Sequence, residues 1–347
     1  MSESTLGKLC LSCFRLKGEY QICPHCGYVE GDPPGHLFCL QPGVILRDRY
    51  IVGRELGYGG FGITYKAYDT ALSIPVAIKE FFPSGLVNRA EGERQVEVFS
   101  GDRKEQYLKF RDRFMNEARS MALFAKEKDI VRVFDYFEDN NTAYIVMEYI
   151  AHPVLKLYLQ EVKRIPERQA VTYACSILSA LEKLHAHGII HRDISPDNIF
   201  VVSPEGVKIF DFGAALLTKE GSEYDPEVVV KAGYAPPEQY SHKGRHDAST
   251  DVYAAGAVLY VMLTGEKPPE SLERNLEDTL VMPSAMGITV SEAVEKALKK
   301  ALMLRQADRF QTAADFRKAL EEGMEKTLKQ PAPEEGDRKE RRRWRWR

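Results

Sequence analysis

The sequence predicts an α+β protein of two lobes, the first rich in β-strands and the second helical, preceded by a small cysteine-rich module. Three observations support this. Short apolar runs separated by turns occupy roughly residues 50–148, and apolar residues at helical spacing dominate from about 154 onward. Four cysteines lie within residues 1–28. A chain of 347 residues, 44% of them hydrophobic, is long enough to bury the core that such an arrangement needs.

Charge and hydropathy narrow the functional class. The net charge of −3 gives no overall attraction to nucleic acid or to a membrane. The longest apolar run, at residues 252–263, is too short to span a bilayer, and no apolar leader precedes the first cysteine. We therefore expect a cytoplasmic protein.

Residues 1–28 have the cysteine spacing of a structural zinc site. Cys10 and Cys13 form one C-x2-C pair, and Cys23 and Cys26 form a second. Four thiolates in two such pairs close a tetrahedron around one Zn2+ and leave no open position for a substrate. The alternatives are disulfides or unrelated thiols, which the absence of a secretion signal disfavours. The segment resembles a short zinc ribbon. Dense glycine and proline then predict a linker at residues 29–46.

The next stretch reads as strand, glycine turn, strand. Tyr50 opens an apolar run, Gly57, Gly59 and Gly62 form a G-x-G-x-x-G pattern, and a second apolar run follows. A dinucleotide-binding turn would lead into a helix, so the hairpin interpretation is preferred. Glycines in such a loop let backbone amides approach phosphate groups closely.

A lysine and a glutamate are predicted to pair within the first lobe. Lys79 ends the apolar run that begins at Val76, and Glu117 falls on the apolar face of the next predicted helix. An inward cation requires an anionic partner, although a surface lysine at a strand end is the alternative. Between them, residues 81–103 form a long connection in which 95–99 suggest an extra strand.

A polar loop, His191 to Asn198, stands between apolar flanks. Two apolar runs, 199–202 and 207–210, follow it and lead into Asp211. A hairpin there would bring Asp193, Asn198 and Asp211 to one end of the sheet. One carboxylate could then orient a hydroxyl, while the other, with the amide oxygen, holds Mg2+ between phosphates.

Taken in order, these motifs resemble the protein-kinase superfamily, in its eukaryotic-like (Hanks-type) bacterial serine/threonine branch. The resemblance covers residues 50 to about 325 and implies a protein-kinase fold over 47–325, with an N-lobe of about 47–148 and a C-lobe of about 151–325. It implies binding of ATP and Mg2+ and phosphorylation of protein serine or threonine. Serine/threonine is favoured because Ser195-Pro196 lacks the arginine typical of tyrosine kinases.

The resemblance also assigns roles. Lys79 and Glu117 would clamp the phosphates, Asp193 would orient the acceptor hydroxyl, and Asn198 and Asp211 would hold Mg2+. It places nucleotide contacts at Leu56, Gly57, Gly59, Gly62, Thr64, Ala77, Lys79, Met147, Glu148 and Ile150. It further implies an activation segment carrying Thr218, Ser222 and Tyr224, which Arg192 could grip when phosphorylated, and an ion pair between Glu238 and Arg309.

The chain departs from the family at two positions. Ser195 stands where serine/threonine kinases carry a lysine, and Lys231 stands where they usually carry a threonine that meets it. The residue types have been exchanged, so Lys231 is predicted to supply the missing cation; the alternative is that it faces solvent and the kinase is slow. Loss of such a charge costs about 3 kcal/mol of transition-state stabilisation or more. Two functions therefore stay open: an active kinase, or an ATP-binding pseudokinase scaffold that acts through partner binding.

The C-terminal residues 326–347 are predicted to be a disordered tail. Arginines alternate with Trp344 and Trp346 within 338–347, which favours contact with an anionic membrane surface or with nucleic acid, although a solvated charge run is an equal alternative. The protein could thus be peripheral to the membrane, and a partner could also bind the ribbon. Because bacterial relatives often carry a membrane span, the chain is also interpretable as a fragment.

Overall fold

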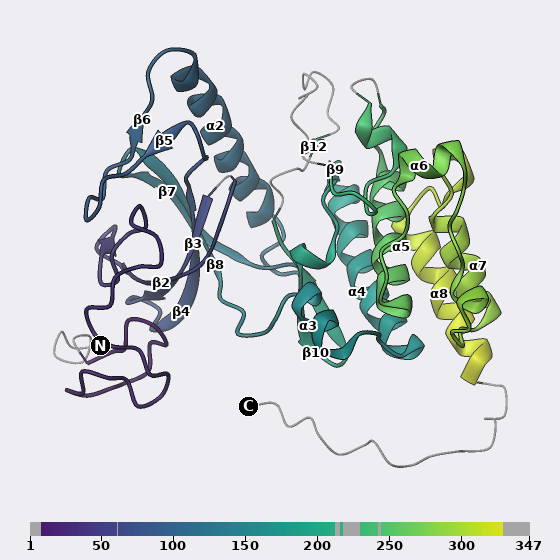
Figure 1. The fold of residues 1–347 in the computed structure, drawn as a ribbon, viewed down its shortest axis with the longest axis horizontal. Helices are drawn as coiled ribbons and strands as arrows, with labels where there is room; N and C mark the ends of the chain where they lie inside the picture. The colour runs from purple at the N-terminus through teal and green to yellow at the C-terminus, as the bar shows by residue number, and fades with distance from the viewer. Residues whose placement is uncertain (1–7, 61, 212–215, 218–229, 242–243, 329–347) are drawn as a thin grey trace. The chain divides into compact units, whose positions relative to one another are not determined.

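The computed structural model describes residues 8–60, 62–211, 216–217, 230–241 and 244–328. The chain divides into two compact units: unit 1 contains Met1–Lys156 with Asp197–Ala215, and unit 2 contains Leu157–Pro196 with Leu216–Arg347. Unit 1 holds most of the strands and unit 2 most of the helices, in agreement with the predicted fold class (Figure 1).

Unit 1 is built on a six-stranded antiparallel sheet in the order β1-β2-β3-β4-β8-β7. Its strands are β1 (Ile45–Leu46), β2 (Tyr50–Gly59), β3 (Gly62–Asp69), β4 (Ile74–Phe81), β7 (Val133–Asp139) and β8 (Thr142–Glu148). The long helix α2 (Asp102–Ala122) runs beside this sheet (Figure 1). It buries an apolar face that includes Tyr107, Phe114 and Met121, as its periodicity predicted.

The six-stranded sheet contains two tight hairpins, and the insertion forms a separate two-stranded sheet. The β2–β3 register pairs Gly57 with Thr64, which confirms the strand, glycine turn, strand prediction. β7 and β8 are joined through Asn140 and Asn141, whose φ angles of 50° and 59° suit a two-residue hairpin turn. The extra strand predicted in the insertion is β6 (Glu97–Val98), which pairs with β5 (Val87–Asn88).

The cysteine module packs on the sheet. Leu9 and Phe14 of the module form an apolar cluster with Ile51 and Tyr68 of the sheet. The rings of Phe14 and Tyr68 stack with centroids 5.6 Å apart. At Gly53 a Cβ atom would lie 2.3 Å from the carbonyl oxygen of Leu11, so only glycine lets the module approach β2 this closely.

The segment predicted to be a linker, residues 29–46, is anchored in the structure. Cys39 and Leu40 are almost completely buried. The Leu40 N–H donates to the Tyr65 hydroxyl at 3.0 Å, and Arg89 donates to the Phe38 carbonyl at 2.9 Å. Ile45 and Leu46 form β1 at the edge of the sheet. Glycine and proline indicated irregular backbone here, but they do not reveal whether such backbone is packed against a core.

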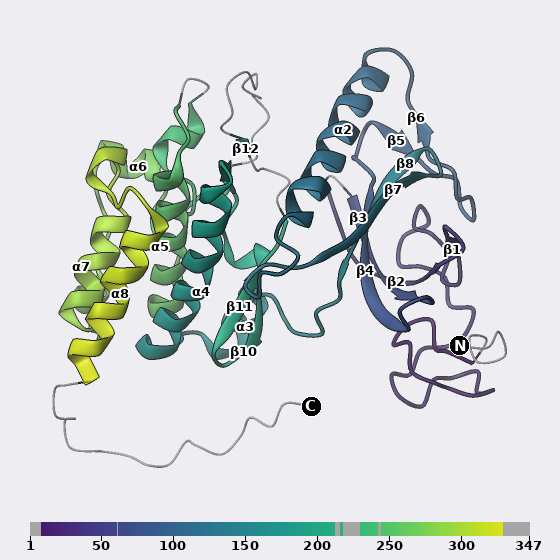
Figure 2. The same ribbon diagram turned by 180° about the vertical axis from the view of Figure 1, so that it is seen from behind.

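Unit 2 is helical. Its main helices are α3 (Leu155–Val162, which begins at the end of unit 1), α4 (Glu167–Ala186), α5 (Ala248–Thr264), α6 (Ser271–Leu276), α7 (Glu292–Ala301) and α8 (Ala313–Leu328). Figure 2 shows α4, α5, α7 and α8 side by side. α5 is buried from Ser249 to Thr264, begins with a capping box at Asp247 and ends at Gly265, whose φ is 79°. Within the described ranges, no helix is long and apolar enough to cross a membrane.

Short elements connect the functional segments. Within unit 2, β9 (Ile189–Ile190) pairs with β12 (Leu216–Leu217), and the remaining single turns are η2 (Pro237–Tyr240), η3 (Pro283–Met286) and η4 (Gln306–Asp308). η1 (Pro196–Asn198) leads into the antiparallel hairpin of β10 (Ile199–Ser203) and β11 (Gly206–Ile209) in unit 1. Arg309 forms the expected buried ion pair with Glu238, with N–O distances of 2.6 and 2.9 Å.

Candidate active site

In unit 1, Lys79 lies between two carboxylates. Its Nζ is 2.8 Å from Asp211 Oδ1 and 3.4 Å from Glu117 Oε1. Lys79 lies on β4, where it pairs with Ile145 of β8; Glu117 lies on α2, and Asp211 follows β11. Burial opposes the charged ammonium, but the negative charges of Asp211 and Glu117 outweigh it and raise the pKa of Lys79. The structure therefore brings together a fixed cation and the two acids that the sequence singled out.

The β10–β11 hairpin brings Asn198 and Asp211 to the same end of unit 1. Ile199 pairs with Ile209, and the Phe210 N–H donates to the Asn198 carbonyl at 3.1 Å. Asp211 has a φ of 65°, a left-handed conformation that is uncommon outside glycine and turns the chain sharply at this point. A carboxylate and an amide oxygen at one hairpin end are the donor types that Mg2+ prefers, so these residues fit the ion.

The residues expected to contact the nucleotide come from four neighbouring strands of unit 1. Leu56, Gly57 and Gly59 lie on β2, Gly62 and Thr64 on β3, Ala77 on β4, Met147 and Glu148 on β8, and Ile150 just after it. Thr64 pairs directly with Lys79, and Ala77 pairs with Met147. The sheet thus aligns the glycine hairpin with the lysine; nucleotide contact at these positions stays a prediction.

In unit 2, a buried aspartate holds the polar loop. Asp251, in the first turn of α5, accepts the backbone N–H groups of His191 and Arg192, each at 2.8 Å. It also lies 2.8 Å from His185 Nε2. Burial opposes its ionisation, but the hydrogen bond and charge of His185 outweigh burial and lower the pKa of Asp251. The Arg192 carbonyl accepts from Gln239, so both backbone polar groups of Arg192 are fixed next to Asp193.

Lys231, from a separate segment of unit 2, contacts the same loop. Its Nζ lies 3.1 Å from Asp193 Oδ1 and donates to Ser195 Oγ at 3.0 Å. Ser195 is fully buried, and the side chains of Asp193 and Lys231 are 20% and 30% exposed. The ammonium is therefore directed at the loop rather than at bulk solvent, as the exchange of residue types predicted.

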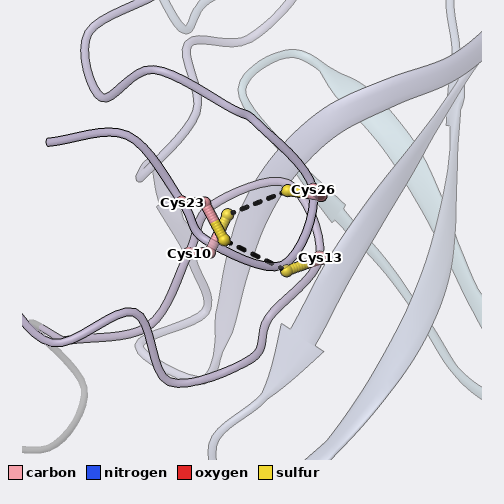
Figure 3. A group of neighbouring side chains, drawn as sticks. All are labelled: Cys10, Cys13, Cys23 and Cys26. Atoms are coloured by element: carbon pink, nitrogen blue, oxygen red, sulfur yellow. Dashed lines mark hydrogen bonds between the residues drawn. The ribbon is translucent and has the colours of Figure 1, made fainter. Parts of the chain in front are cut away.

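The four cysteines of the first module converge on one point (Figure 3). Their Sγ atoms all lie within 4.8 Å of one another, with Cys10 and Cys26 at 3.6 Å and Cys13 and Cys23 at 3.7 Å. Zn–S bonds of about 2.3 Å in a tetrahedron place sulfurs about 3.8 Å apart. A disulfide would need about 2.05 Å. The thiols therefore fit one tetrahedral metal ion.

Backbone hydrogen bonds repeat in the two cysteine pairs. The N–H of Cys10 donates to the Arg15 carbonyl and that of Cys23 to the Tyr28 carbonyl, at 2.9 and 2.8 Å. The carbonyls of the same two cysteines accept from the residues four positions on, Phe14 and Gly27, which have φ angles of 58° and 75°. The two cysteine pairs are therefore built on the same kind of turn.

Comparisons with known proteins match this arrangement. The protein kinase domain family matches residues 50–322. The chain belongs to the protein kinase family. It is 34% identical over 281 residues to a probable serine/threonine-protein kinase of Clostridium acetobutylicum, a match that covers 79% of this chain and 40% of that protein. It is 33% identical over 288 residues to the serine/threonine-protein kinase PknB of Mycobacterium tuberculosis, covering 79% and 43%.

A solved structure supports the same fold. The structure named "PpkA-294 apo form" is 29% identical, covers 82% of this chain and 99% of its own, and has a TM-score of 0.72. The chain spans less than half the length of the two curated kinase relatives above.

Sequence reasoning missed the anchoring of the polar loop by Asp251 and Gln239. The available signal was an acidic residue within the first turn of an otherwise apolar helix, which requires buried partners. It also missed Lys208 on β11, whose Nζ lies 2.8 and 2.6 Å from the carboxylate oxygens of Glu148; nothing in the sequence indicates that pair. The phosphorylation candidates Thr218 and Ser222, Tyr224 of the same segment, and the basic tail lie outside the described residues.

Proposed function

We propose that the protein is an active serine/threonine protein kinase that transfers the γ-phosphate of ATP to protein hydroxyls. The observation that carries this proposal is the pairing of Lys79 with both Glu117 and Asp211. A kinase needs that lysine to be charged and held beside the acid that binds Mg2+. Both conditions are met within unit 1. Membership of the family and relatives named as serine/threonine kinases support the choice of acceptor.

The proposed reaction divides its work among few residues. Asp193 orients the acceptor hydroxyl and accepts its proton as the oxygen attacks the γ-phosphorus. The new O–P bond forms while the bond to the β–γ bridging oxygen breaks, and its electron pair leaves with ADP. Lys79 binds the α- and β-phosphates, and Asn198 and Asp211 would hold Mg2+, which neutralises charge on the phosphate oxygens.

The proposal is tested by phosphate incorporation into a generic protein acceptor, measured with Mg2+ and γ-labelled ATP. The parent chain should transfer label. Asp211→Asn should lose about a hundredfold or more in rate, since it removes an ion-binding carboxylate. As a control, Asp315→Asn should leave the rate unaltered, because Asp315 lies in the first turn of α8 and accepts an exposed hydrogen bond from the Thr312 hydroxyl. A parent chain that binds ATP and transfers nothing would contradict the proposal. The comparisons give no support to the scaffold alternative.

We further propose that Cys10, Cys13, Cys23 and Cys26 bind one structural Zn2+. The mutual distances of their sulfurs and the repeated turns support this. Four sulfur ligands leave no catalytic position, so the ion would stabilise the module. Elemental analysis of the reduced protein should give one zinc per chain, and Cys26→Ser should release it. A zinc content far below one per chain would contradict this proposal.

Contacts beyond the acceptor protein are proposed for two regions. The tail 338–347, with its alternating arginines and tryptophans, is proposed to bind anionic membrane surfaces, which would place the protein at the membrane periphery. The exposed apolar side chains of the ribbon, Leu16, Tyr20 and Ile22, support a partner site there. The fraction of protein that sediments with phosphatidylserine vesicles should fall when residues 344–347 are removed. An unaltered fraction would contradict the membrane proposal. If the tail instead retains the protein on immobilised RNA, nucleic acid would be favoured as its partner.

A further inference from the structure

We infer that Lys231 supplies the positive charge that stabilises the transferring phosphoryl group, from a segment separate from the loop that carries Asp193. The inference rests on the proposed kinase activity and deepens it. Its basis is the position of one ammonium, 3.1 Å from Asp193 Oδ1 and 3.0 Å from Ser195 Oγ. Both contacts lie within unit 2, among described residues.

The hydrogen-bonding capacity of the ammonium supports this role. A lysine has three N–H donors. Two of them point to Asp193 and Ser195, and these are its only partners in the part of the chain that the structure describes. One donor remains for an oxygen of a phosphoryl group. Asp193 is proposed to accept the proton of the attacking hydroxyl, so a cation in contact with it lies next to the bond that forms.

Charge balance favours the same role. Phosphoryl transfer spreads negative charge over the oxygens of the moving group, and a preorganised cation stabilises that charge more than it stabilises the substrate. The loop 191–198 carries Arg192, but that residue is only 7% exposed, and its own backbone N–H and carbonyl bind Asp251 and Gln239. Ser195 is neutral. Lys156 also contacts the loop, but at Asp197, with its Nζ 2.7 Å from Oδ1. Lys231 contacts Asp193 itself, and 30% of its side chain is exposed and therefore open to a substrate.

The backbone around Lys231 fixes its position. Its carbonyl accepts the N–H groups of Tyr234 and Ala235, at 3.0 and 3.1 Å. The Ala235 carbonyl in turn accepts from the Ser271 hydroxyl at 2.8 Å. The ammonium is thus held by a turn that is itself attached to α6. Because Lys231 and Ser195 are 36 residues apart, the site is complete only when residues 231–235 are seated.

The step itself is ordinary phosphoryl transfer. The acceptor oxygen forms its bond to the γ-phosphorus, the bond to the bridging oxygen breaks with its electrons leaving on ADP, and the proton passes to Asp193. Lys231 exchanges no proton in this scheme. It donates a hydrogen bond to an oxygen of the transferring group while it stays in contact with Asp193.

The test uses the full chain and separates binding from chemistry. Four variants are compared with the parent: Lys231→Ala, Lys231→Arg, the double exchange Ser195→Lys with Lys231→Thr, and a control, Lys267→Ala. Lys267 donates to the Ala232 carbonyl of the same segment but is not directed at Asp193. The control substitution therefore removes an equal charge near the site. Single-turnover transfer at saturating ATP gives the chemical rate, and a fluorescent nucleotide gives the dissociation constant.

Lys231→Ala should lower the single-turnover rate by about a hundredfold or more, the cost of removing one transition-state donor, with nucleotide affinity and melting temperature little altered. Lys231→Arg and the double exchange should each recover at least about tenfold, because they restore a cation at the site. The inference is overturned if Lys231→Ala keeps the parent rate, if affinity or stability falls in step with the rate, if the double exchange is no faster than Lys231→Ala, or if Lys267→Ala is equally slow. An inactive parent would instead contradict the proposed function.

Discussion

Removing the buried guanidinium of Arg89 should destabilise unit 1 strongly. Arg89 and Glu80, a residue of β4, both have fully buried side chains and form an ion pair. Arg89 also donates to the Phe38 carbonyl at 2.9 Å, so it joins the insertion, β4 and the segment after the ribbon. In Arg89→Met the Glu80 carboxylate would keep, among the described residues, its bonds from the Tyr65 and Tyr144 hydroxyls, at 2.9 and 2.8 Å.

The magnitude follows from this burial. Breaking a fully buried ion pair by removing one partner costs about 3–5 kcal/mol, because the remaining charge has no compensating cation. The negative charge of Glu80 outweighs burial and raises the pKa of Arg89, which agrees with a strongly favourable pairing. The double change Arg89→Met with Glu80→Gln removes the unpaired charge, and we expect it to recover about half of the loss or more.

Urea unfolding gives the measurement, with the free energy extrapolated to water. Arg317→Met is the matched control, because the Arg317–Glu182 pair is about a third exposed and should cost at most about 1 kcal/mol. An Arg89→Met protein within about 1 kcal/mol of the parent would refute the reasoning. So would a double variant less stable than the single one.

Three further changes test other parts of the structure. Gly53→Ala places a methyl group against the Leu11 carbonyl and should release the ribbon from the sheet, so that a chelator removes zinc faster. In the control Gly206→Ala the methyl group has room, and zinc loss should match that of the parent. Equal rates of zinc loss from the two variants would argue against the docking. Arg309→Lys should lower the free energy of unfolding by about 2–4 kcal/mol because a lysine cannot reproduce the buried two-bond fork, and a loss below about 1 kcal/mol in urea would contradict this. Since the pKa of Asp251 is held below its ordinary 3.8, its contribution to stability is complete above that pH and disappears as the pH falls through the folded-state pKa. Asp251→Asn should therefore flatten the acid limb of the stability profile below about pH 4, and a profile parallel to that of the parent would count against it.

Much of the fold could be predicted because its patterns are local. The apolar face of α2, the glycine hairpin and the helical spacing of α4 each follow from residues a few positions apart. The packing of the ribbon could not be predicted, because it depends on Gly53, which stands far from the ribbon in sequence and makes room for it. The anchoring of residues 38–40 was also missed. Their partner Arg89 is distant in sequence and lies in an insertion with no recognisable motif.

In the candidate site, too, some contacts could be predicted from the sequence and others could not. Lys79 and Glu117 were paired from strand and helix patterns, since an inward charge requires a partner. The contact of Lys231 with Asp193 was predicted only because two residue types departed from a family pattern in a complementary way. The place of Asp251 in the first turn of an apolar helix indicates only that it needs buried partners. Its role as the acceptor of two loop N–H groups became visible only with the backbone in place.

The central claim is that this chain transfers phosphate, and phosphoamino-acid analysis of the reaction products tests it most directly. The full chain is incubated with Mg2+, γ-labelled ATP and a protein acceptor, beside an Asp193→Asn variant shown to bind ATP equally well. We predict labelled phosphoserine and phosphothreonine from the parent and at least about a hundredfold less from the variant. Label confined to phosphotyrosine, equal labelling by both proteins, or no labelling by a parent that binds ATP would contradict the account.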